Sequence, residues 1–306
     1  MKKVFLCEFI HPEAYAQLKA HAEIISSWDR FSEADAVIDR NFKITEELLQ
    51  TTDRLKVIGV HGTGTDDVDL EAAKRHGVDV FSVPHQNAQS VAEMNVALML
   101  SVGRKVVLAD RMVGDETEPK ANLFAELQGT EFSGKTLGLI GIGEISKRTA
   151  NICKYGFGMS VIGWSRHMSD AEANTLGIEC MSDMDDVFRN ADVIMIGLSL
   201  DDSTRGLIGK HQFEQMKKTA FLINSTRGAI LDEEALFEAL RDGKMAGAAC
   251  DVFTKEPLSV ENKLLELPNF VGTPHLGANT DDALKRVGMA VVKGVLERLE
   301  RLNLKE

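Results

Sequence analysis

Short apolar runs alternate with amphipathic stretches along the first part of the chain. Runs rich in valine, isoleucine and leucine, separated by segments with apolar residues at helical spacing, are typical of strands joined by crossover helices. The expected strands are residues 4–7, 36–38 and 55–60, and the expected helices are residues 12–21 and 45–51. This alternation predicts a parallel sheet covered by helices.

The same alternation resumes after a long helical pattern. Apolar residues recur at helical spacing from residue 91 to about residue 113, and the stretch 114–119, which contains Gly and Pro, ends this predicted helix. A second series follows and closes with a helix over residues 280–299. Its six expected strands are residues 137–140, 160–164, 193–198, 220–224, 247–251 and 270–273. Six strands make a complete doubly wound dinucleotide-binding sheet.

The bulk properties narrow the class of protein. A chain of 306 residues with 44% hydrophobic content predicts two domains, because single cores rarely grow beyond about 250–300 residues. The net charge of -12 disfavours nucleic acid and anionic lipid as partners. No apolar run reaches the roughly 18 residues of a membrane helix or forms a signal-peptide core, which favours a soluble cytoplasmic protein. The cysteines are too scattered for a zinc site or a disulfide framework, and no metal is expected; they are Cys7, Cys153, Cys180 and Cys250.

A glycine-rich segment, G-L-I-G-I-G-E-I-S, stands between a predicted strand and a predicted helix. Gly141 permits the tight turn, and Gly143 lets the main chain approach a pyrophosphate. The helix that begins near Ile145 offers free N–H groups and its positive dipole end to phosphates. Glu144 adds a negative charge nearby, and Ser146 replaces the third glycine, which predicts slightly looser packing. The segment is therefore expected to bind a dinucleotide, although a simple strand-to-helix turn has the same pattern.

The end of the next predicted strand bears on which dinucleotide binds. An Asp or Glu at this position holds the ribose hydroxyls of NAD, but the chain has Ser165, Arg166 and His167 there. Without the acid nothing repels a 2′-phosphate, and Arg166 could pair with one, so NADP is slightly favoured over NAD. In the alternative, Ser165 binds the ribose of NAD and Arg166 lies in solvent.

Three further segments supply an arginine, a carboxylate and an imidazole. They are N-S-T-R-G with Arg227, D-V-F-T-K-E-P-L with Glu256, and T-P-H-L-G with His275. A guanidinium can hold a carboxylate or carbonyl oxygen through two hydrogen bonds, and a carboxylate beside an imidazole stabilises its protonated form. Each residue alone has a plain alternative as a surface charge or a turn residue.

The order, flanks and separations of these three segments resemble those of the D-2-hydroxyacid dehydrogenase family. The resemblance implies an α/β protein in which a Rossmann-type doubly wound parallel sheet domain, residues 99–282, is inserted into a flavodoxin-like α/β domain, residues 1–98 and 283–306. The inserted domain would bind the cofactor, and the other would bind the substrate. A homodimer is also implied, with the segment 91–134 as the expected contact.

The implied reaction is reversible hydride transfer between a nicotinamide and C2 of a small 2-oxo acid such as glyoxylate, hydroxypyruvate or 3-phosphoglycerate. Arg227 would hold the carbonyl and carboxylate of the substrate. His275 would donate a proton to the carbonyl oxygen and take it back in the oxidative direction. Glu256 would keep His275 charged until needed, and Asp251 would lie near the nicotinamide carboxamide.

A loop near residue 60 is similar to the family loop that binds the substrate carboxylate through backbone amides. Its sequence is V-H-G-T-G-T-D-D-V-D, and Thr63 and Gly64 are the expected donors. His61 and His85 flank this loop and the next family segment, and they either contact a distal anionic group of the substrate or only close loops. His61 is the stronger candidate for a substrate contact.

The chain departs from the family pattern at Gly197 and Ser199, where many relatives have His-x-Pro on the nicotinamide side. Two other functions share the fold. Formate dehydrogenases usually have glutamine in place of Glu256, which disfavours that activity. Some relatives are dinucleotide-sensing corepressors that bind cofactor without turnover, and the complete set of three residues favours an enzyme instead.

Overall fold

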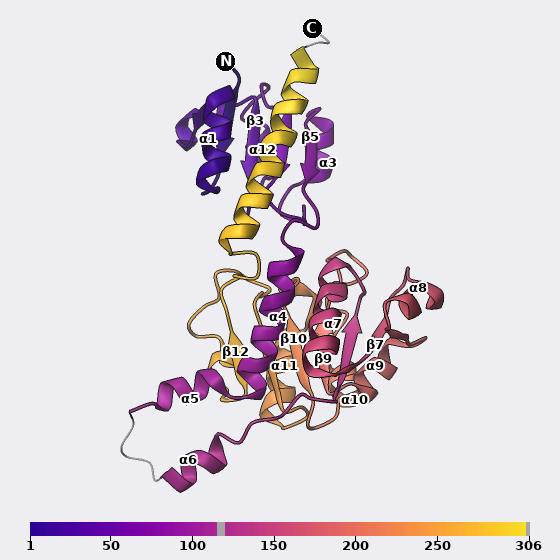
Figure 1. Ribbon diagram of the computed structural model, residues 1–306. Coiled ribbons are helices and arrows are strands. Elements are labelled where there is room, and N and C mark those ends of the chain that lie inside the picture. Colours follow the sequence, from indigo (N-terminus) through magenta and orange to yellow (C-terminus); the bar gives the residue numbers. More distant parts are fainter. Residues whose placement is uncertain (115–119, 304–306) are drawn as a thin grey trace. The chain divides into compact units, whose positions relative to one another are not determined.

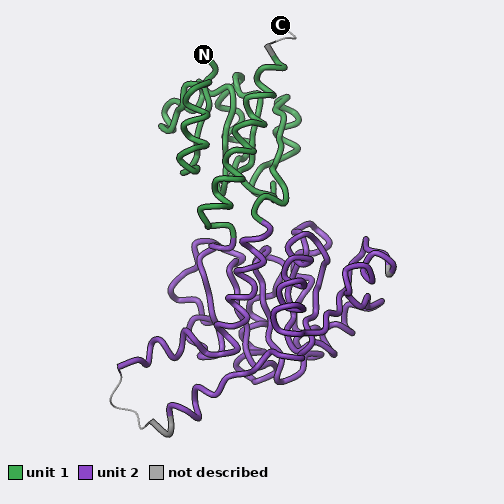
Figure 2. Tube along the Cα trace, in the orientation of Figure 1, with its two compact units in different colours: residues 1–87, 278–306 green, residues 88–277 purple. Residues whose placement is uncertain are grey.

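The computed structural model describes residues 1–114 and 120–303. The chain divides into two compact units (Figure 2), one of residues 1–87 and 278–306 and the other of residues 88–277. The first unit is therefore formed by two separate segments of the chain, and the second unit is inserted between them. Within the described ranges, no helix combines the length and apolar character needed to cross a membrane.

The sequence-based boundaries, after residues 98 and 282, fall inside two helices of the structure. These helices are α4 (Ala88–Gly103) and α12 (Asp281–Asn303). α4 packs on the sheet of the second unit, and α12 packs on α1 and β4 of the first unit. The unit boundaries precede both helices because each helix contributes its buried face to one core.

Five parallel strands in the order β2-β1-β3-β4-β5 form the sheet of the first unit, which is the flavodoxin-like order. The strands are β1 (Lys3–Leu6), β2 (Glu23–Ile25), β3 (Ala36–Asp39), β4 (Val57–Val60) and β5 (Asp79–Ser82). One face is covered by α1 (Pro12–His21) and α12 (Figure 1). The other is covered by the 3-10 helix η1 (Trp28–Glu33), α2 (Glu46–Leu49) and α3 (Leu70–Arg75).

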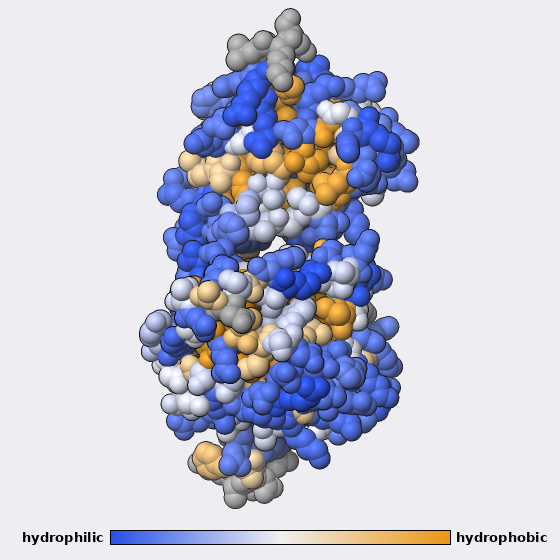
Figure 3. All heavy atoms as spheres, turned by 90° about the vertical axis from the view of Figure 1, so that its right-hand side faces the viewer, coloured by the Kyte–Doolittle hydropathy of each residue, from blue (hydrophilic) through white to orange (hydrophobic). Residues whose placement is uncertain are grey.

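Sequence patterns do not identify four of these elements: β2, η1, α3 and β5. β2 has three residues and α3 has six, too few for a periodic signal. β5 begins with the exposed Asp79 and lies at the sheet edge. Hydrophobic side chains reach the surface on the side of the first unit that carries β5 (Figure 3).

Seven parallel strands form the sheet of the second unit, in the order β12-β11-β10-β9-β6-β7-β8. Six of these strands, in the order β8-β7-β6-β9-β10-β11, follow the Rossmann order, and β12 is added at one edge. The strands are β6 (Thr136–Ile140), β7 (Ser160–Trp164), β8 (Glu179–Cys180), β9 (Val193–Ile196), β10 (Phe221–Asn224), β11 (Gly247–Cys250) and β12 (Phe270–Gly272). The expected count of six is therefore too low by β8, whose two residues carry no detectable pattern.

Two cores fill the faces of this sheet, since its strands are buried on both sides. α4, α7 (Glu144–Phe157) and α8 (Asp170–Thr175) cover one face. α9 (Met184–Asn190), α10 (Lys210–Gln215) and α11 (Glu233–Arg241) cover the other. Short 3-10 turns, η2 (Gly228–Ile230) and η3 (Lys263–Glu266), follow β10 and precede β12.

The single helix expected over residues 91–113 is two helices. α4 ends at Gly103, and Lys105 lies in the left-handed region at φ 53° before α5 (Val106–Met112) begins. Gly103 is packed by Phe132, since a Cβ at Gly103 would lie 2.2 Å from that ring. The helical spacing of apolar residues continues across the break and so hides it. The stretch 115–119, expected to end the helix, lies outside the described residues, and α6 (Lys120–Glu126) follows it.

Candidate active site

The arginine, glutamate and histidine segments meet at one edge of the second unit's sheet. Arg227, Glu256 and His275 follow β10, β11 and β12, which are neighbours in the parallel sheet. The carboxyl ends of parallel strands share an edge, so the three side chains share a neighbourhood. The imidazole Nδ1 of His275 lies 2.8 Å from Oε2 of Glu256. The predicted pairing is thus present in the structure.

Glu256 is held in its charged form. Its Oε1 accepts a hydrogen bond from the main-chain N–H of Phe253 at 2.9 Å, while Oε2 contacts His275. Burial by itself would raise the pKa of Glu256, but these two hydrogen bonds and the nearby charge of Arg227 outweigh it and lower the pKa. The carboxylate is therefore ionised at neutral pH and faces an imidazole.

The loop that carries His275 is organised by Asp251. The carboxylate of Asp251 is fully buried, and it accepts bonds from the Thr273 hydroxyl (2.6 Å) and from the main-chain N–H groups of Leu276 and Gly277 (2.7 Å each). The N–H of His275 donates to the carbonyl of Asp251, and His275 lies in the left-handed region at φ 57°.

Asp251 therefore organises the loop that carries His275, because both of its carboxylate oxygens accept bonds from that loop. The expected contact with the nicotinamide carboxamide stays a prediction. Such a left-handed conformation costs of order 1 kcal/mol or more for a non-glycine residue and persists only where the surroundings impose it. Asp251 supplies those surroundings.

The loop that carries Arg227 is held by Asn224 and by close packing at Gly228. The amide of Asn224 donates to the carbonyl of Arg227 at 3.0 Å and accepts from the N–H of Thr226 at 3.1 Å. A Cβ at Gly228 would lie 1.9 Å from the main-chain carbon of Phe253. Gly228 therefore brings the Arg227 loop against the segment that leads to Glu256.

The glycine-rich turn follows β6, as the sequence predicts. Gly141 has φ 90°, which favours glycine, and the Ser146 hydroxyl donates to its carbonyl at 2.7 Å. Ser146 is buried, so the looser packing expected from this replacement is not found. A Cβ at Gly197 would lie 2.1 Å from the Ser146 hydroxyl oxygen. Glycine at position 197 therefore leaves the space that the Ser146 hydroxyl occupies, so these two differences from the family pattern are linked.

The start of α7 fits the phosphates of a dinucleotide. Gly143 is the N-cap of α7, has no side-chain cap, and is exposed, with nothing within 4 Å of the position its Cβ would take. The first N–H groups of the helix are therefore open to an anion. Glu144 and Ile145 begin the helix, and the charge of Glu144 is balanced by Lys147, whose Nζ lies 3.3 Å from its carboxylate.

The residues after β7 form hydrogen bonds within the chain, and the choice between NADP and NAD stays a prediction. The Ser165 hydroxyl accepts a bond from the N–H of His167 at 3.3 Å. Arg166 is exposed but not free: it donates to the Ser203 hydroxyl at 2.7 Å, and another guanidinium nitrogen lies 3.4 Å from Asp201. Arg166 therefore joins the loop after β7 to the loop after β9.

The loop after β4 in the first unit has open backbone donors. The N–H groups of Thr63 and Gly64 have no hydrogen-bond acceptor among residues 1–114 and 120–303. His61, in contrast, is buried, and its pKa is lowered to about 4 by burial and by the charge of Arg40. A neutral, buried imidazole cannot supply a positive charge to an anionic substrate. His85 is exposed in the following loop and has φ 70°.

Arg40 is a candidate that the sequence patterns did not single out. It follows β3, next to the strand that precedes Thr63, and the residue is half-buried. No hydrogen bond or ion pair engages this side chain within the described part of the chain. Its place at the carboxyl edge of a parallel sheet is the signal that identifies it, and this requires the topology.

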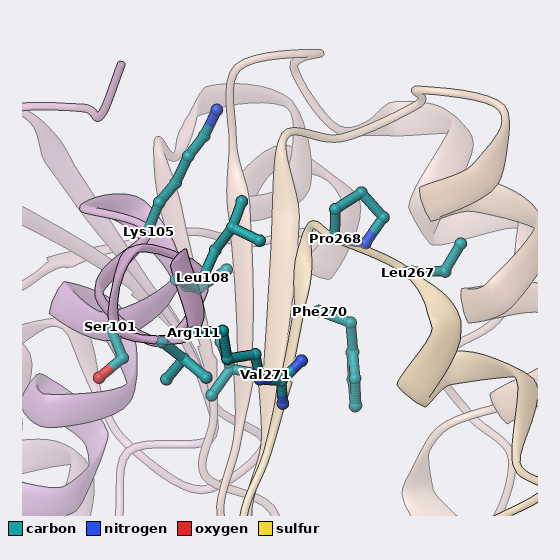
Figure 4. A pocket seen from close by; sticks show the side chains of 10 residues that line it. Ser101, Lys105, Leu108, Arg111, Leu267, Pro268, Phe270 and Val271 are labelled. Atoms are coloured by element: carbon teal, nitrogen blue, oxygen red, sulfur yellow. The ribbon is translucent and has the colours of Figure 1, made fainter. Parts of the chain in front are cut away.

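A small cavity elsewhere in the second unit is not the active site. It has a volume of about 30 Å³ and lies between α5 and the start of β12, with Lys105, Arg111, Pro268 and Phe270 in its wall (Figure 4). Such a volume suits one water molecule. The cavity is at the amino end of β12, whereas His275 follows the carboxyl end.

Comparisons with known proteins agree with this geometry. Residues 96–277 match the family described as D-isomer specific 2-hydroxyacid dehydrogenase, NAD binding domain. The chain is 35% identical to a glyoxylate reductase of Aeropyrum pernix over 96% of this chain and 92% of that protein. It is 35% identical to a D-3-phosphoglycerate dehydrogenase of Methanocaldococcus jannaschii over 96% of this chain, but it spans only 57% of that longer relative.

The fold is likewise similar to that of a solved relative. A D-lactate dehydrogenase from Aquifex aeolicus, in complex with NAD and lactic acid, has a TM-score of 0.84 and 26% identity. The similarity covers 99% of this chain and 97% of that one.

Proposed function

Because the chain belongs to the D-isomer-specific 2-hydroxyacid dehydrogenase family, we propose that it interconverts a small 2-oxo acid and the corresponding D-2-hydroxy acid. The observation that carries the proposal is the contact between His275 and Glu256, at 2.8 Å, beside Arg227. A proton donor, an ionised partner and a carboxylate-binding fork are together the groups that carbonyl reduction requires from a protein.

Each of the three residues has a separate task in this proposal. The guanidinium of Arg227 holds the carbonyl and carboxylate oxygens of the acid. His275 donates its proton to the carbonyl oxygen during reduction and accepts it during oxidation, and the ionised Glu256 stabilises the imidazolium before the transfer. Asp251 keeps His275 in place through the loop bonds described above.

The second unit would bind a nicotinamide dinucleotide. The bound nicotinamide supplies or accepts the hydride at C2. We propose that Gly141, Gly143, Glu144 and Ile145 surround the pyrophosphate at the start of α7, and that Ser165 and Arg166 lie at the adenosine ribose. The open α7 N-terminus supports this assignment, and the matched family description names NAD. Because an acid after β7 is absent, both NAD and NADP remain candidates, and Arg166 is the residue that would contact a 2′-phosphate.

The first unit would bind the substrate carboxylate and any distal anionic group. The open N–H groups of Thr63 and Gly64 support a carboxylate contact. The charge of the half-buried residue Arg40 replaces His61 as the proposed partner of a distal anion, since His61 is neutral. Glyoxylate and hydroxypyruvate need only the first contact, whereas a phosphorylated acid related to 3-phosphoglycerate would also need Arg40.

We further propose that the protein is a homodimer that contacts its partner through the segment 91–134. Within the described part of that segment, Val106, Val113 and Phe124 are exposed apolar side chains. Residues 115–119 of the segment lie outside the described ranges. Large exposed apolar side chains grouped in one segment are characteristic of protein interfaces.

A panel of 2-oxo acids, assayed with NADH and with NADPH, tests the proposed function. Oxidation of either cofactor with glyoxylate, hydroxypyruvate or 3-phosphohydroxypyruvate, and loss of the rate in Arg227→Lys, would support it, because a point charge does not reproduce a bidentate fork. Cofactor binding without turnover on any acid would instead indicate the corepressor-like alternative.

A further inference from the structure

Arg166 forms a bridge between two loops of the second unit. Its Nη1 donates to the Ser203 hydroxyl at 2.7 Å, and its Nη2 lies 3.4 Å from Oδ2 of Asp201. Arg166 follows β7, whereas Asp201 and Ser203 follow β9. The strand β6 lies between these two strands in the sheet.

The bridge therefore passes over the carboxyl end of β6, where the glycine-rich turn begins. In a doubly wound sheet this is the topological switch point, and the adenosine half of a dinucleotide lies at the end of the second strand, here β7. The guanidinium that a 2′-phosphate would need is thus already engaged at the place where that phosphate would arrive.

Asp201 is fixed in position by the turn it closes. Its Oδ1 accepts bonds from the N–H groups of Ser203 (2.8 Å) and Thr204 (3.0 Å), which leaves Oδ2 for Arg166. The hydrogen bonds from Ser203 and the charge of Arg166 lower the pKa of Asp201 to about 2. Its carboxylate is therefore charged throughout the physiological range.

We propose that Asp201 sets the cofactor selectivity of this protein by acting as the counter-ion of Arg166. The inference rests on the proposed function and deepens its cofactor assignment. The carboxylate of Asp201 acts in two ways. It competes with a 2′-phosphate for the guanidinium, and its negative charge repels that phosphate, which itself carries nearly two negative charges. The wild-type protein consequently binds NADH at least as well as NADPH, although an acid after β7 is absent.

The size of the effect follows from the contacts. The side chains of Arg166 and Asp201 are 40% and 50% exposed, and exposed ion pairs are weak. An arginine released to a phosphate gains a charge-assisted bond, which is stronger. Removing the Asp201 charge is expected to tighten NADPH binding about tenfold and to change NADH binding less than about twofold.

The test is calorimetric titration of NADH and NADPH into the full chain, which needs no turnover. The variants are Asp201→Asn, which keeps Oδ1 as the turn acceptor, Arg166→Ala, and the double variant. Asp202→Asn is the matched control, because this exposed neighbour loses the same charge and its side chain has no partner among the described residues.

Tighter NADPH binding in Asp201→Asn, absent from Asp202→Asn and from the Arg166→Ala background, would support the inference. An equal gain in Asp201→Asn and Asp202→Asn would overturn it, because the effect would then be one of net charge. A gain that survives in the double variant would overturn it as well. Failure of the wild type to bind either cofactor would instead refute the proposed function itself, and the inference with it.

Discussion

His275 is the residue whose removal best isolates the chemistry. We predict that His275→Ala lowers kcat by about 10²- to 10⁴-fold, the usual contribution of general acid catalysis, while the dissociation constant for cofactor stays near the wild-type value. Steady-state kinetics together with cofactor titration measure both. Glu256→Gln is the companion variant, since it keeps the shape but not the charge beside the imidazole. A rate close to wild type in His275→Ala would remove the imidazole from the mechanism.

The buried carboxyl of Asp39 leads to a prediction about how the free energy of unfolding depends on pH. This carboxyl is buried at the end of β3, and burial raises its pKa from 3.8 to about 6. Between these values the folded protein binds more protons than the unfolded chain, so the free energy of unfolding falls as pH rises and is constant above about pH 6. The shift corresponds to roughly 2–3 kcal/mol.

Asp39→Asn removes the carboxyl whose ionisation lowers the free energy of unfolding. The variant should therefore gain stability relative to the wild type as pH rises from 4 to 6. Urea unfolding at several pH values measures the difference. His61 changes the free energy of unfolding with pH in the opposite direction. Its pKa is lowered to about 4, so its contribution to stability increases as pH rises from 4 to its ordinary pKa. The two groups therefore partly cancel in the wild type. Parallel curves for the variant and the wild type would contradict the assignment to Asp39.

At the scale of elements, Gly228 allows the loops after β10 and β11 to touch. We predict that Gly228→Ala destabilises the fold by about 1–3 kcal/mol, the range for overpacking, and lowers activity further because the Arg227 and Glu256 loops must separate. Its Cβ would overlap the main chain of Phe253, not a movable side chain. Thermal unfolding and kinetics report the two effects.

Gly156 is the control for that substitution. It lies near the end of α7, and nothing is within 4 Å of its Cβ position. Gly156→Ala should leave activity unchanged and stabilise the fold by about 0.5–1 kcal/mol, because alanine favours the helix. Equal losses in the two variants would mean that packing at Gly228 is not special.

At the scale of the whole molecule, we predict that Phe124→Glu shifts the protein from dimer to monomer. This side chain is 78% exposed on α6 within the proposed contact segment, and a charge in an apolar interface is costly. Sedimentation velocity at several concentrations measures the change. The exposed Tyr155 on α7, outside the segment, gives the control variant Tyr155→Glu. A wild-type protein that sediments as a monomer would contradict the proposal.

Much of this molecule could be predicted from the chain alone because the information is local. The apolar runs of β6, β9 and β10 are long enough to show their type, and Gly141 and Gly143 mark a turn between a strand and a helix. Arg227, Glu256 and His275 stand in segments with restricted backbones, so their order along the chain already indicated a shared chemistry. The α/β class and the parallel arrangement followed from the same alternation.

Contacts between segments that are distant in the sequence decided the features that the local pattern does not show. Only the sheet order places Arg166 beside Asp201, and only packing shows that Gly197 accommodates Ser146. The break at Lys105, the burial of His61 and the three bonds that turn Asp251 toward the His275 loop have no periodic signal. The local sequence pattern indicates which secondary structure each segment prefers. Burial and hydrogen-bond partners depend instead on which strands become neighbours. That choice is made by the tertiary structure.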